Sequence, residues 1–423
     1  MDSLKNQYDC VVVGGGPAGA TTAALVAEKG IQTLLVEREK MPRFHVGESL
    51  MPETYWSLER LGVLDKLHNG MFTKKNGVQF VNHEGKESQP FFFRDADDRE
   101  CADTLHVQRG EFDKVLFDNA SEKGATCFDQ TRVLNITLND SGLHQVTLRD
   151  REGHEVTVET KMVVDASGQQ AMISSNMKTK EVDPHLKKAA IWTYFKDARR
   201  NSSPEPEVTA ILHTNSKKCW FWYIPLSDDT VSVGVVSDND YLLKGRGTPE
   251  QTFHDEWQQC VGIKNRLQDA KQVGKFNVAK EFSYKSRQVA GEGWVLVGDA
   301  YGFIDPIYSS GVFLALKSGE MAADAIIEGF ENGDLSGDQL GSWREPFEAG
   351  VVWIRKLVDA FYTPEFSFGE FMKAYPQHRT NLTDLLVGKV FEGEPGRMFT
   401  DMDPWIASLS ENSDETMSAS VSS

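Results

Sequence analysis

The sequence lacks both a membrane-spanning segment and a targeting segment. It contains no run of about 18 or more apolar residues, the length that a helix needs to cross a bilayer. Residues 1–9 are polar and lack the apolar stretch of a signal peptide. We therefore expect a cytoplasmic protein with no membrane span.

Positive charge and paired cysteines are also scarce. The 63 acidic residues outnumber the 45 Lys and Arg residues, and the net charge of −18 should repel nucleic acid and anionic membranes. None of the five cysteines belongs to a C-x-x-C pair, so neither a zinc site nor a disulfide framework is expected. We predict reduced cysteines, no metal and no nucleic-acid partner.

The N-terminal segment has the pattern of a dinucleotide-binding unit. An apolar strand at residues 8–13 runs into Gly14, Gly16 and Gly19, which satisfy G-x-G-x-x-G, and a helical pattern follows. The first glycine permits the turn, the second lets backbone approach a pyrophosphate, and the third lets the helix pack on the strand. A second strand ends in Glu37, whose carboxylate is suited to a ribose. The unit by itself does not distinguish FAD from NAD.

Four charged residues beyond this unit each have two interpretations. Arg43 and Glu48 follow it directly and either face the cofactor or form a surface ion pair. Arg109 opens a helical pattern after a strand and is either a phosphate or flavin contact or a salt-bridging arginine. Lys75 stands before a short strand, where a lysine is usually part of a solvated turn.

Strands predominate between residues 180 and 287. A capping box at residues 248–251 begins a helix that we expect to continue to about residue 270. In one strand, alternation places Trp220 and Trp222 on one face and Phe221 on the other. We predict an inserted substrate domain, in which large side chains of this kind usually belong to an ordinary core.

The chain returns to the cofactor domain in the segment 298–311. A strand at residues 294–297 leads into it, and a helix predicted over about 312–330 leads out, with Ser309 as its N-cap. A strand, a glycine-rich turn and a helix N-terminus in this order form a pocket of backbone N–H groups. Such a pocket suits a flavin edge or a small anion.

Three motifs together resemble those of a known superfamily. The glycine fingerprint with Glu37, the Arg109 element and the Gly298-Asp299 pair are similar to the FAD-binding parts of the group A flavoprotein monooxygenases. The similarity covers most of residues 8–345. It implies an α/β fold of the para-hydroxybenzoate hydroxylase type, with a Rossmann-like FAD-binding domain, an inserted antiparallel-sheet substrate domain and a helical C-terminal region.

Two further motifs resemble those of one family within that superfamily, the flavin-dependent halogenases. The segment 220–225 is similar to the W-x-W-x-I-P signature of this family, and the segment 303–311 matches its F-x-x-P-x-x-S-x-G signature at every fixed position. Lys75 lies where the family has its catalytic lysine. The resemblance therefore favours a functional Lys75, with Lys74 as a solvated neighbour.

The family resemblance implies a definite chemistry. Reduced FAD, delivered by a separate flavin reductase, reacts with O2, and the resulting oxidant converts chloride or bromide to hypohalous acid. That acid travels to the lysine, which passes the halogen to an electron-rich aromatic substrate of the phenol or pyrrole kind. If Lys75 is largely buried, its pKa should be lowered, and the neutral amine is the required nucleophile.

The resemblance also assigns roles residue by residue. It makes Lys75 the catalytic residue, the backbone of Ser310 and Gly311 the halide site, and Trp220, Trp222 and Phe303 the walls that exclude water and separate substrate from flavin. The expected FAD contacts are Gly14, Gly16, Ala18, Gly19, Glu37, Arg43, Ser49, Arg109, Asp299, Pro306 and Gly311.

One position departs from part of the family. Tryptophan halogenases have Glu just before the signature Ser, and this chain has Tyr308 there, which favours the phenol and pyrrole branch. Some members of that branch act on substrates tethered to an acyl carrier protein. Carriers are usually acidic, so docking would need a local basic patch, and we expect a free aromatic substrate instead. Candidate patches are Lys178, Lys180, Lys187 and Lys188, or Lys217 and Lys218.

Two rival functions and a division of the chain complete the predictions. One rival is a hydroxylase or a geranylgeranyl-reductase-like enzyme of the same fold, and the other is a flavin-binding protein without a reaction of its own. We expect a discontinuous FAD-binding domain and a substrate domain, followed by a helical region and a disordered tail. The FAD-binding domain comprises residues 1–80, 105–180 and 288–345, and the substrate domain comprises residues 81–104 and 181–287. The helical region comprises residues 346–407, and the tail comprises residues 408–423.

Overall fold

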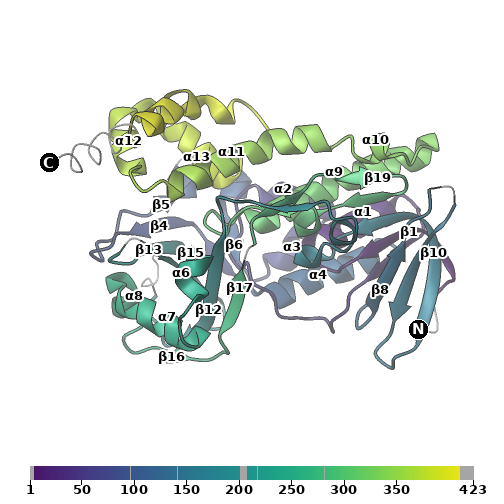
Figure 1. Cartoon of the computed structure of the whole chain (residues 1–423), viewed down its shortest axis with the longest axis horizontal. Coiled ribbons are helices and arrows are strands. Elements are labelled where there is room, and N and C mark those ends of the chain that lie inside the picture. The colour runs from purple at the N-terminus through teal and green to yellow at the C-terminus, as the bar shows by residue number, and fades with distance from the viewer. Residues whose placement is uncertain are drawn as a thin grey trace. The chain divides into compact units, whose positions relative to one another are not determined.

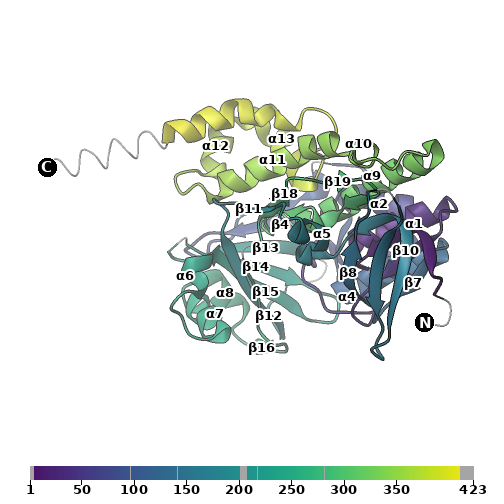
Figure 2. The same cartoon turned by 45° about the vertical axis from the view of Figure 1, so that its right-hand side comes forward.

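The computed structural model describes residues 4–95, 97–140, 142–200, 207–216, 218–280 and 282–409. The chain divides into two compact units, Met1–Trp343 and Arg344–Ser423. Figures 1 and 2 label the elements of both units. Across the described ranges, no helix is both long enough and apolar enough to cross a membrane. From residue 410 onward, the tail predicted to be disordered lies outside the described residues.

The first sheet of the larger unit carries the dinucleotide-binding motif. Its strand order is β19-β20-β10-β1-β2-β7, and β9, which also pairs with β8, joins it at β10. β1 runs parallel to β2 and to β10, and all four residues of β2 are buried, as expected for a parallel sheet covered on both faces. The strands are β1 (Gln7–Val13), β2 (Thr33–Val36), β7 (Thr126–Phe128), β8 (Arg132–Thr137), β9 (His144–Arg149), β10 (Glu155–Asp165), β19 (Ala290–Gly291) and β20 (Trp294–Leu296).

Three long helices accompany this sheet. α1 contacts both α4 and α9, and the three are grouped beside β1 in Figure 1. The bounds of these helices are α1 (Pro17–Glu28), α4 (Arg109–Glu122) and α9 (Ser310–Asn332). The predicted strand, glycine turn, helix and second strand are therefore all present.

The second large sheet is mostly antiparallel and has the order β16-β12-β15-β14-β13-β4-β5, with β17 paired to β12. Three short helices cover one face of it (Figure 2), where Phe221 and Tyr223 form a buried core with Phe253 and Ile263 of those helices. The elements are β4 (Gly77–Val81), β5 (Phe91–Phe92), β12 (Lys188–Lys196), β13 (Val208–His213), β14 (Trp220–Pro225), β15 (Val231–Asp238), α6 (Asn239–Leu243), α7 (Pro249–Gln258), α8 (Val261–Arg266), β16 (Lys271–Gln272) and β17 (Asn277–Lys280).

Shorter elements connect the two sheets. A ladder of β3 and β6 and a three-stranded sheet of order β11-β18-β21 lie outside the large sheets. Their bounds, with those of the remaining helices, are β3 (Thr73–Lys75), β6 (Thr104–His106), β11 (Lys180–Val182), β18 (Tyr284–Ser286), β21 (Gly302–Phe303), α2 (Thr54–Leu61), α3 (Leu64–Leu67), α5 (Met172–Asn176), α10 (Gly337–Leu340), and the 3-10 turns η1 (Phe93–Asp95), η2 (Glu100–Ala102), η3 (Gly168–Gln170) and η4 (Gly298–Ala300).

The smaller unit is helical. Its elements are α11 (Arg344–Tyr362), α12 (Phe368–Ala374), η5 (Pro376–His378), α13 (Arg379–Val387) and η6 (Pro395–Met398). The fully buried Phe371 packs on Tyr375, on His378 and edge-on against Trp405. Most of the aromatic residues that the sequence places here therefore serve packing within this unit.

The prediction of a single helix that runs to about residue 270 is correct at its start but wrong in its length. The capping box forms, because the Thr248 side chain accepts a hydrogen bond from the Gln251 N–H at 3.2 Å. The helix nevertheless stops at Gln258, and a second begins at Val261. Between them Cys260 is extended, with φ −113° and ψ 102°, and is buried against the sheet. The free energy gained by burying this segment therefore outweighs the free energy that a continuous helix would gain.

Candidate active site

The glycine-rich turn after β1 needs glycine at two of its three fingerprint positions. Gly14 has φ +110°, and a side chain there would place Cβ 2.3 Å from the Ala166 carbonyl oxygen. A Cβ on Gly19 would lie 1.9 Å from the carbonyl oxygen of Gly14. These contacts bring α1 close to β1 and β10. The α1 N-terminus, with its positive dipole end, therefore faces the cavity beside Gly16.

Glu37 organises the end of β2. It is buried, and its carboxylate accepts hydrogen bonds from the Gly15 and Glu39 N–H groups, both at 3.0 Å. Arg43 Nε lies 3.3 Å from the same carboxylate. Glu37 also lines the cavity, so it is placed to meet a ligand at the carboxyl end of the sheet, where ligands bind in open α/β sheets.

Two arginines share one buried carboxylate at the start of α4. Arg109 Nε and Nη2 donate to Asp113 at 2.8 and 3.0 Å, and Arg43 Nη1 donates to it at 2.8 Å. Burial raises the pKa of Asp113, but the two guanidiniums outweigh burial and hold it below its ordinary value. With Glu37 the cluster holds two positive and two negative groups, which fixes both arginines at the cavity wall.

The segment 298–311 forms the opposite wall. Gly298 has φ +57° and begins η4, so Asp299 turns toward the cavity. Burial raises the pKa of Asp299 to about 6, against the opposing charges of Arg109 and Lys180. Asp299 is thus a carboxyl group held in a low-dielectric site beside cationic neighbours.

Ser309 does not act as the predicted side-chain cap. It occupies the N-cap position of α9, but its backbone is left-handed, with φ 58°, and its side chain makes no capping hydrogen bond. The tight turn that starts from Pro306, with a hydrogen bond from the Ser309 N–H to the Pro306 carbonyl at 3.0 Å, imposes this geometry. The Phe303 ring lies so close to Gly311 that a Cβ there would be 2.9 Å from it. The side chain of Ser309 therefore leaves the first turn of α9 available for an anion.

The W-x-W-x-I-P strand divides its side chains as the alternation predicts. Trp220, Trp222 and Ile224 line the cavity, whereas Phe221 and Tyr223 belong to the core under α7. The two indole rings are 6.3 Å apart between centroids. They form an apolar wall on the side of the cavity that faces the second large sheet.

One cavity collects most of the residues predicted to bind FAD or face it. Gly19 and Ser310 are not in its lining, because Gly19 packs between α1 and β1 and Ser310 is buried at the start of α9. Lys75 is also not in its lining. The predicted residues that do line it are Gly14, Gly16, Ala18, Glu37, Arg43, Ser49, Arg109, Trp220, Trp222, Asp299, Phe303, Pro306 and Gly311.

Lys75 is buried at the end of β3 and is 2% exposed. Its ammonium donates to the Leu50 carbonyl at 2.7 Å and lies 5.4 Å from the Phe93 ring centroid. Burial lowers the pKa of Lys75 to about 7, and no charged group opposes this effect. Lys74, by contrast, is exposed, as predicted. A solvated turn is therefore the wrong interpretation of Lys75.

A hydrogen-bonded chain joins the cavity wall to the strand beside Lys75. Ser49 Oγ and His106 Nε2 each lie 2.8 Å from Thr209 Oγ1, and Ser49 and Thr209 line the cavity. His106 is fully buried, and β6 carries it next to β3. Sequence reasoning missed Thr209 and Asp113. Thr209 is one strand residue among many, whereas the Arg109-to-Asp113 spacing of four residues was a usable helical signal.

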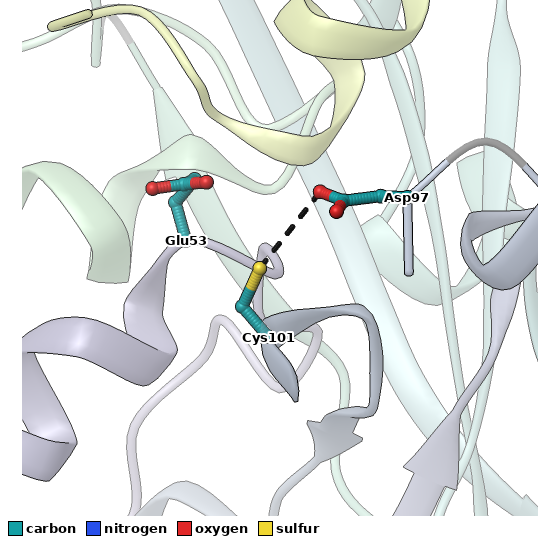
Figure 3. A group of neighbouring side chains, drawn as sticks. All are labelled: Glu53, Asp97 and Cys101. Atoms are coloured by element: carbon teal, nitrogen blue, oxygen red, sulfur yellow. Dashed lines mark hydrogen bonds between the residues drawn. The ribbon is translucent and has the colours of Figure 1, made fainter. Parts of the chain in front are cut away.

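Within the part of the chain that the structure describes, two groups of side chains lie close enough together to act as metal ligands. Figure 3 shows Glu53, Asp97 and Cys101 together, with the Cys101 thiol 3.9 Å from Asp97. Arg99 Nη2 lies 2.6 Å from both carboxylates, so a guanidinium already pairs with each of them. The second group, Asp150, Glu152 and His154, lies in the turn between β9 and β10.

Comparison with known proteins supports the prediction that this chain binds FAD. A family model described as an FAD binding domain matches residues 7–331. A 1H-pyrrole-2-carbonyl-[peptidyl-carrier protein] chlorinase of Pseudomonas fluorescens is 31% identical and aligns over 96% of this chain and 94% of its own length. The chain belongs to the flavin-dependent halogenases. A brominase of Pseudoalteromonas luteoviolacea that acts on the same kind of carrier-bound pyrrole is also 31% identical, over 93% of this chain and 95% of its own length.

A solved structure of a halogenase has the same fold. The flavin-dependent brominase Bmp2 is 28% identical, with a TM-score of 0.84 over 94% of this chain and 99% of that structure. The protein is thus an FAD-dependent oxidoreductase that uses a halide, and the predictions of family, fold class and cofactor are confirmed. A flavin-binding protein without an activity of its own is no longer a competing interpretation.

Proposed function

We propose that this halogenase generates hypohalous acid in the FAD cavity and passes its halogen through Lys75 to an electron-rich ring. The main support for this proposal is Lys75, a buried amine whose pKa is lowered to about 7. It binds the carbonyl of Leu50, the residue next to Ser49 in the cavity wall. A neutral amine at this place has no evident structural purpose, since a buried lysine destabilises the fold.

The residues present fit FAD. Gly14 permits the turn that brings α1 close to β10, Gly16 would let a pyrophosphate approach the α1 N-terminus, and Glu37 stands where a ribose would lie. Arg43 and Arg109 supply positive charge, and Asp299 would meet the ribityl side, with Ala18, Ser49, Pro306 and Gly311 as further contacts and Gly19 packing α1 on β1. When bound in reduced form, FAD supplies the electrons that activate O2. A separate flavin reductase would deliver it.

The N-terminus of α9 is the proposed halide site. Chloride or bromide would bind the backbone N–H groups of Ser310 and Gly311, where the helix dipole favours an anion and the Ser309 side chain does not compete. Trp220, Trp222 and Phe303 would exclude water and keep a ring-sized substrate away from the flavin. This exclusion favours oxidation of the halide over direct hydroxylation of the substrate.

Lys75 would then carry the halogen. Its nitrogen lone pair forms an N–X bond with hypohalous acid, the X–O bond breaks, and water leaves. An electron-rich carbon takes the halogen next, loses its proton to the amine nitrogen and restores the neutral lysine. The lowered pKa keeps a large fraction of Lys75 in the nucleophilic form near pH 7.

The proposed substrate is a pyrrole-type ring on a carrier protein, in place of the free aromatic expected from the sequence. Two relatives that align over more than nine-tenths of both lengths are named for that substrate. The carrier would need positive charge on a chain of net charge −18. Lys178 and Lys187 are exposed, Lys180 lies over the Tyr284 ring, and Lys188 pairs with Asp238. Of the other pair considered, Lys217 lies outside the described residues.

The deciding experiment is a mass-spectrometric halogenation assay. Wild type, Lys75→Ala and the exposed control Lys74→Ala receive a flavin reductase, FAD, NADH and bromide, with pyrrole-2-carboxylate either free or carrier-bound. We expect brominated carrier-bound pyrrole from wild type and Lys74→Ala, and a loss of at least about 10³-fold in Lys75→Ala at unchanged FAD affinity. A brominated product from Lys75→Ala at the wild-type rate contradicts the relay, and an oxygenated product favours the hydroxylase alternative.

A further inference from the structure

Glu48 is a buried carboxyl group that the halogen relay leaves unused. It is 2% exposed, and it lines both the FAD cavity and a second cavity on the other side of the 42–48 loop. One carboxylate oxygen accepts from the Tyr194 hydroxyl at 2.6 Å, and the other accepts from the Gly47 N–H at 3.0 Å. Glu48 is therefore a carboxyl group shared by the two cavities, both of which are also lined by Arg43, His45 and Arg109.

Tyr194 reaches the second cavity, which borders solvent. Its ring is half-buried and meets the exposed Phe44 edge-on, with 6.0 Å between centroids. Lys196 and Lys275, both exposed, line the same cavity. The Tyr194 hydroxyl, which donates to Glu48, is therefore placed to pass a proton from this cavity to Glu48.

On its other side, the residue next to Glu48 lies close to the proposed halide site. A Cβ on the neighbouring Gly47 would be 3.0 Å from Arg109 Nη1 and 3.9 Å from a methyl group of Val312, in the first turn of α9. Burial raises the pKa of Glu48 above its ordinary value, while Tyr194, Gly47 and Arg109 act against this effect. The environment of Glu48 thus favours its protonated form through burial, and Arg109 stabilises the carboxylate once the proton has left.

Halogenation consumes protons. In the balanced reaction, reduced FAD (FADH2), O2, a halide anion, one proton and an aromatic C–H give oxidised FAD, the aromatic halide and two waters. The proton must enter the water-excluding cavity in every turnover, because an anion from solution ends in a neutral C–X bond. General acids positioned at such sites typically contribute a factor of about 10²–10⁴ in rate.

We propose that Glu48 donates this proton and that Tyr194 reloads Glu48 from the second cavity. The O–H bond of the Glu48 carboxyl group breaks and its proton passes to an oxygen atom that leaves as water. The carboxylate then takes the Tyr194 hydroxyl proton while Tyr194 takes one from solvent. The inference rests on the proposed halide chemistry for the use of the proton, but not on the role of Lys75.

The test is infrared spectroscopy of FAD-loaded protein, which needs no turnover. Wild type is compared with Glu48→Gln, Tyr194→Phe and the control Tyr223→Phe, which loses a 2.6 Å hydrogen bond to the Arg199 carbonyl in the core on the far face of the sheet. We expect a protonated-carboxyl band near neutral pH that Glu48→Gln removes. Its exchange in D2O should be slowed about tenfold or more in Tyr194→Phe and unchanged in Tyr223→Phe.

Two results would overturn the proposal. One is a spectrum in which Glu48→Gln removes no protonated-carboxyl band, and the other is unchanged exchange in Tyr194→Phe. The halogenation assay adds a separate outcome: Glu48→Gln should lower the rate about 10²-fold at unchanged FAD affinity. If Lys75→Ala remained active, the relay through Lys75 would fail while the infrared result for Glu48 still stood.

Discussion

The properties of Lys75 arise from what surrounds it rather than from a charged partner. A carbonyl and an aromatic ring are its named contacts, and neither compensates fully for the removal of an ammonium from water. The pKa falls because the neutral form loses less on burial. The same burial that would create the proposed nucleophile therefore makes the folded protein less stable at low pH.

Lys75→Met should make the protein more stable, by about 2–4 kcal/mol at pH 6. The folded-state pKa, about 7, lies below the ordinary value of 10.5, so the penalty is fully present below pH 7. It declines as pH rises from about 7 to 10.5, because the unfolded chain then binds more protons than the folded one. Urea unfolding at pH 6 and pH 9 measures the difference. Lys74→Met, at an exposed position, should change stability by less than about 0.5 kcal/mol at both pH values.

The indole rings of β14 can form a wall of the cavity because the neighbouring strand β15 lacks a side chain at one position. Gly234 lies opposite Trp222 in the ladder, and a Cβ there would be 2.2 Å from the indole ring. The ring therefore lies flat over the sheet, with its N–H donating to Ser232 at 3.1 Å. A single glycine thus determines how far the apolar wall extends into the cavity.

Gly234→Ala should push the Trp222 ring into the FAD cavity. We expect a loss of about 1–3 kcal/mol in stability from overpacking and FAD binding weakened about tenfold. Fluorescence titration with FAD, together with thermal unfolding, tests both. The control is Gly247→Ala, where the new Cβ would meet only ordinary contacts at 3.4 Å. FAD affinity equal in the two variants would show that Gly234 does not position the indole.

The helix α9 couples the proposed halide site to the glycine-rich turn. A Cβ on Gly319 would lie 2.7 Å from the Ala18 carbonyl, and Thr22 Oγ1 donates to the Gly319 carbonyl at 3.1 Å. α1 and α9 therefore touch through backbone. Because both helices begin at the cavity, this contact fixes the distance between the two N-termini that would hold anionic groups.

Over the whole molecule, negative charge dominates, but the cavity does not share that excess. The chain carries a net charge of −18, whereas Arg43 and Arg109 meet Glu37 and Asp113 in equal number at the cavity. The partial positive charges at the helix N-termini then make the electrostatic potential in the cavity more positive. A dianionic pyrophosphate and a halide can therefore bind to a protein that repels anions overall.

FAD should stabilise the unit Met1–Trp343, which contains the cavity. At a free concentration about 100 times the Kd, binding adds about 2.7 kcal/mol and should raise the unfolding midpoint by roughly 5 °C. Differential scanning fluorimetry with a series of FAD concentrations measures the shift. In the matched variant Gly16→Asp, a carboxylate would occupy the pyrophosphate position at α1, and the shift should vanish. A shift retained in that variant would place the cofactor elsewhere.

Local sequence determined the parts of the protein that depend on neighbouring residues. The glycine fingerprint predicted the first β-α-β unit, since close backbone contact requires glycine at Gly14 and Gly19 whatever the rest of the chain does. Alternation in β14 predicted which indoles face the cavity. The halogenase signatures and the similarity they carry predicted the family, which the comparison with known proteins confirms.

Only the tertiary structure decided the chemistry of the charged groups. Lys75 is buried because Leu50 and Phe93 close over it, Thr209 meets Ser49 across 160 residues, and Tyr194 meets Glu48 across 146. A pKa and a hydrogen bond depend on the local dielectric and on which distant atoms lie within about 3 Å, and neither is encoded in residue spacing. The sequence by itself determined the family, the cofactor and which residues are proposed to bind FAD and halide. Burial and long-range contacts decided which of them hold or lose a proton.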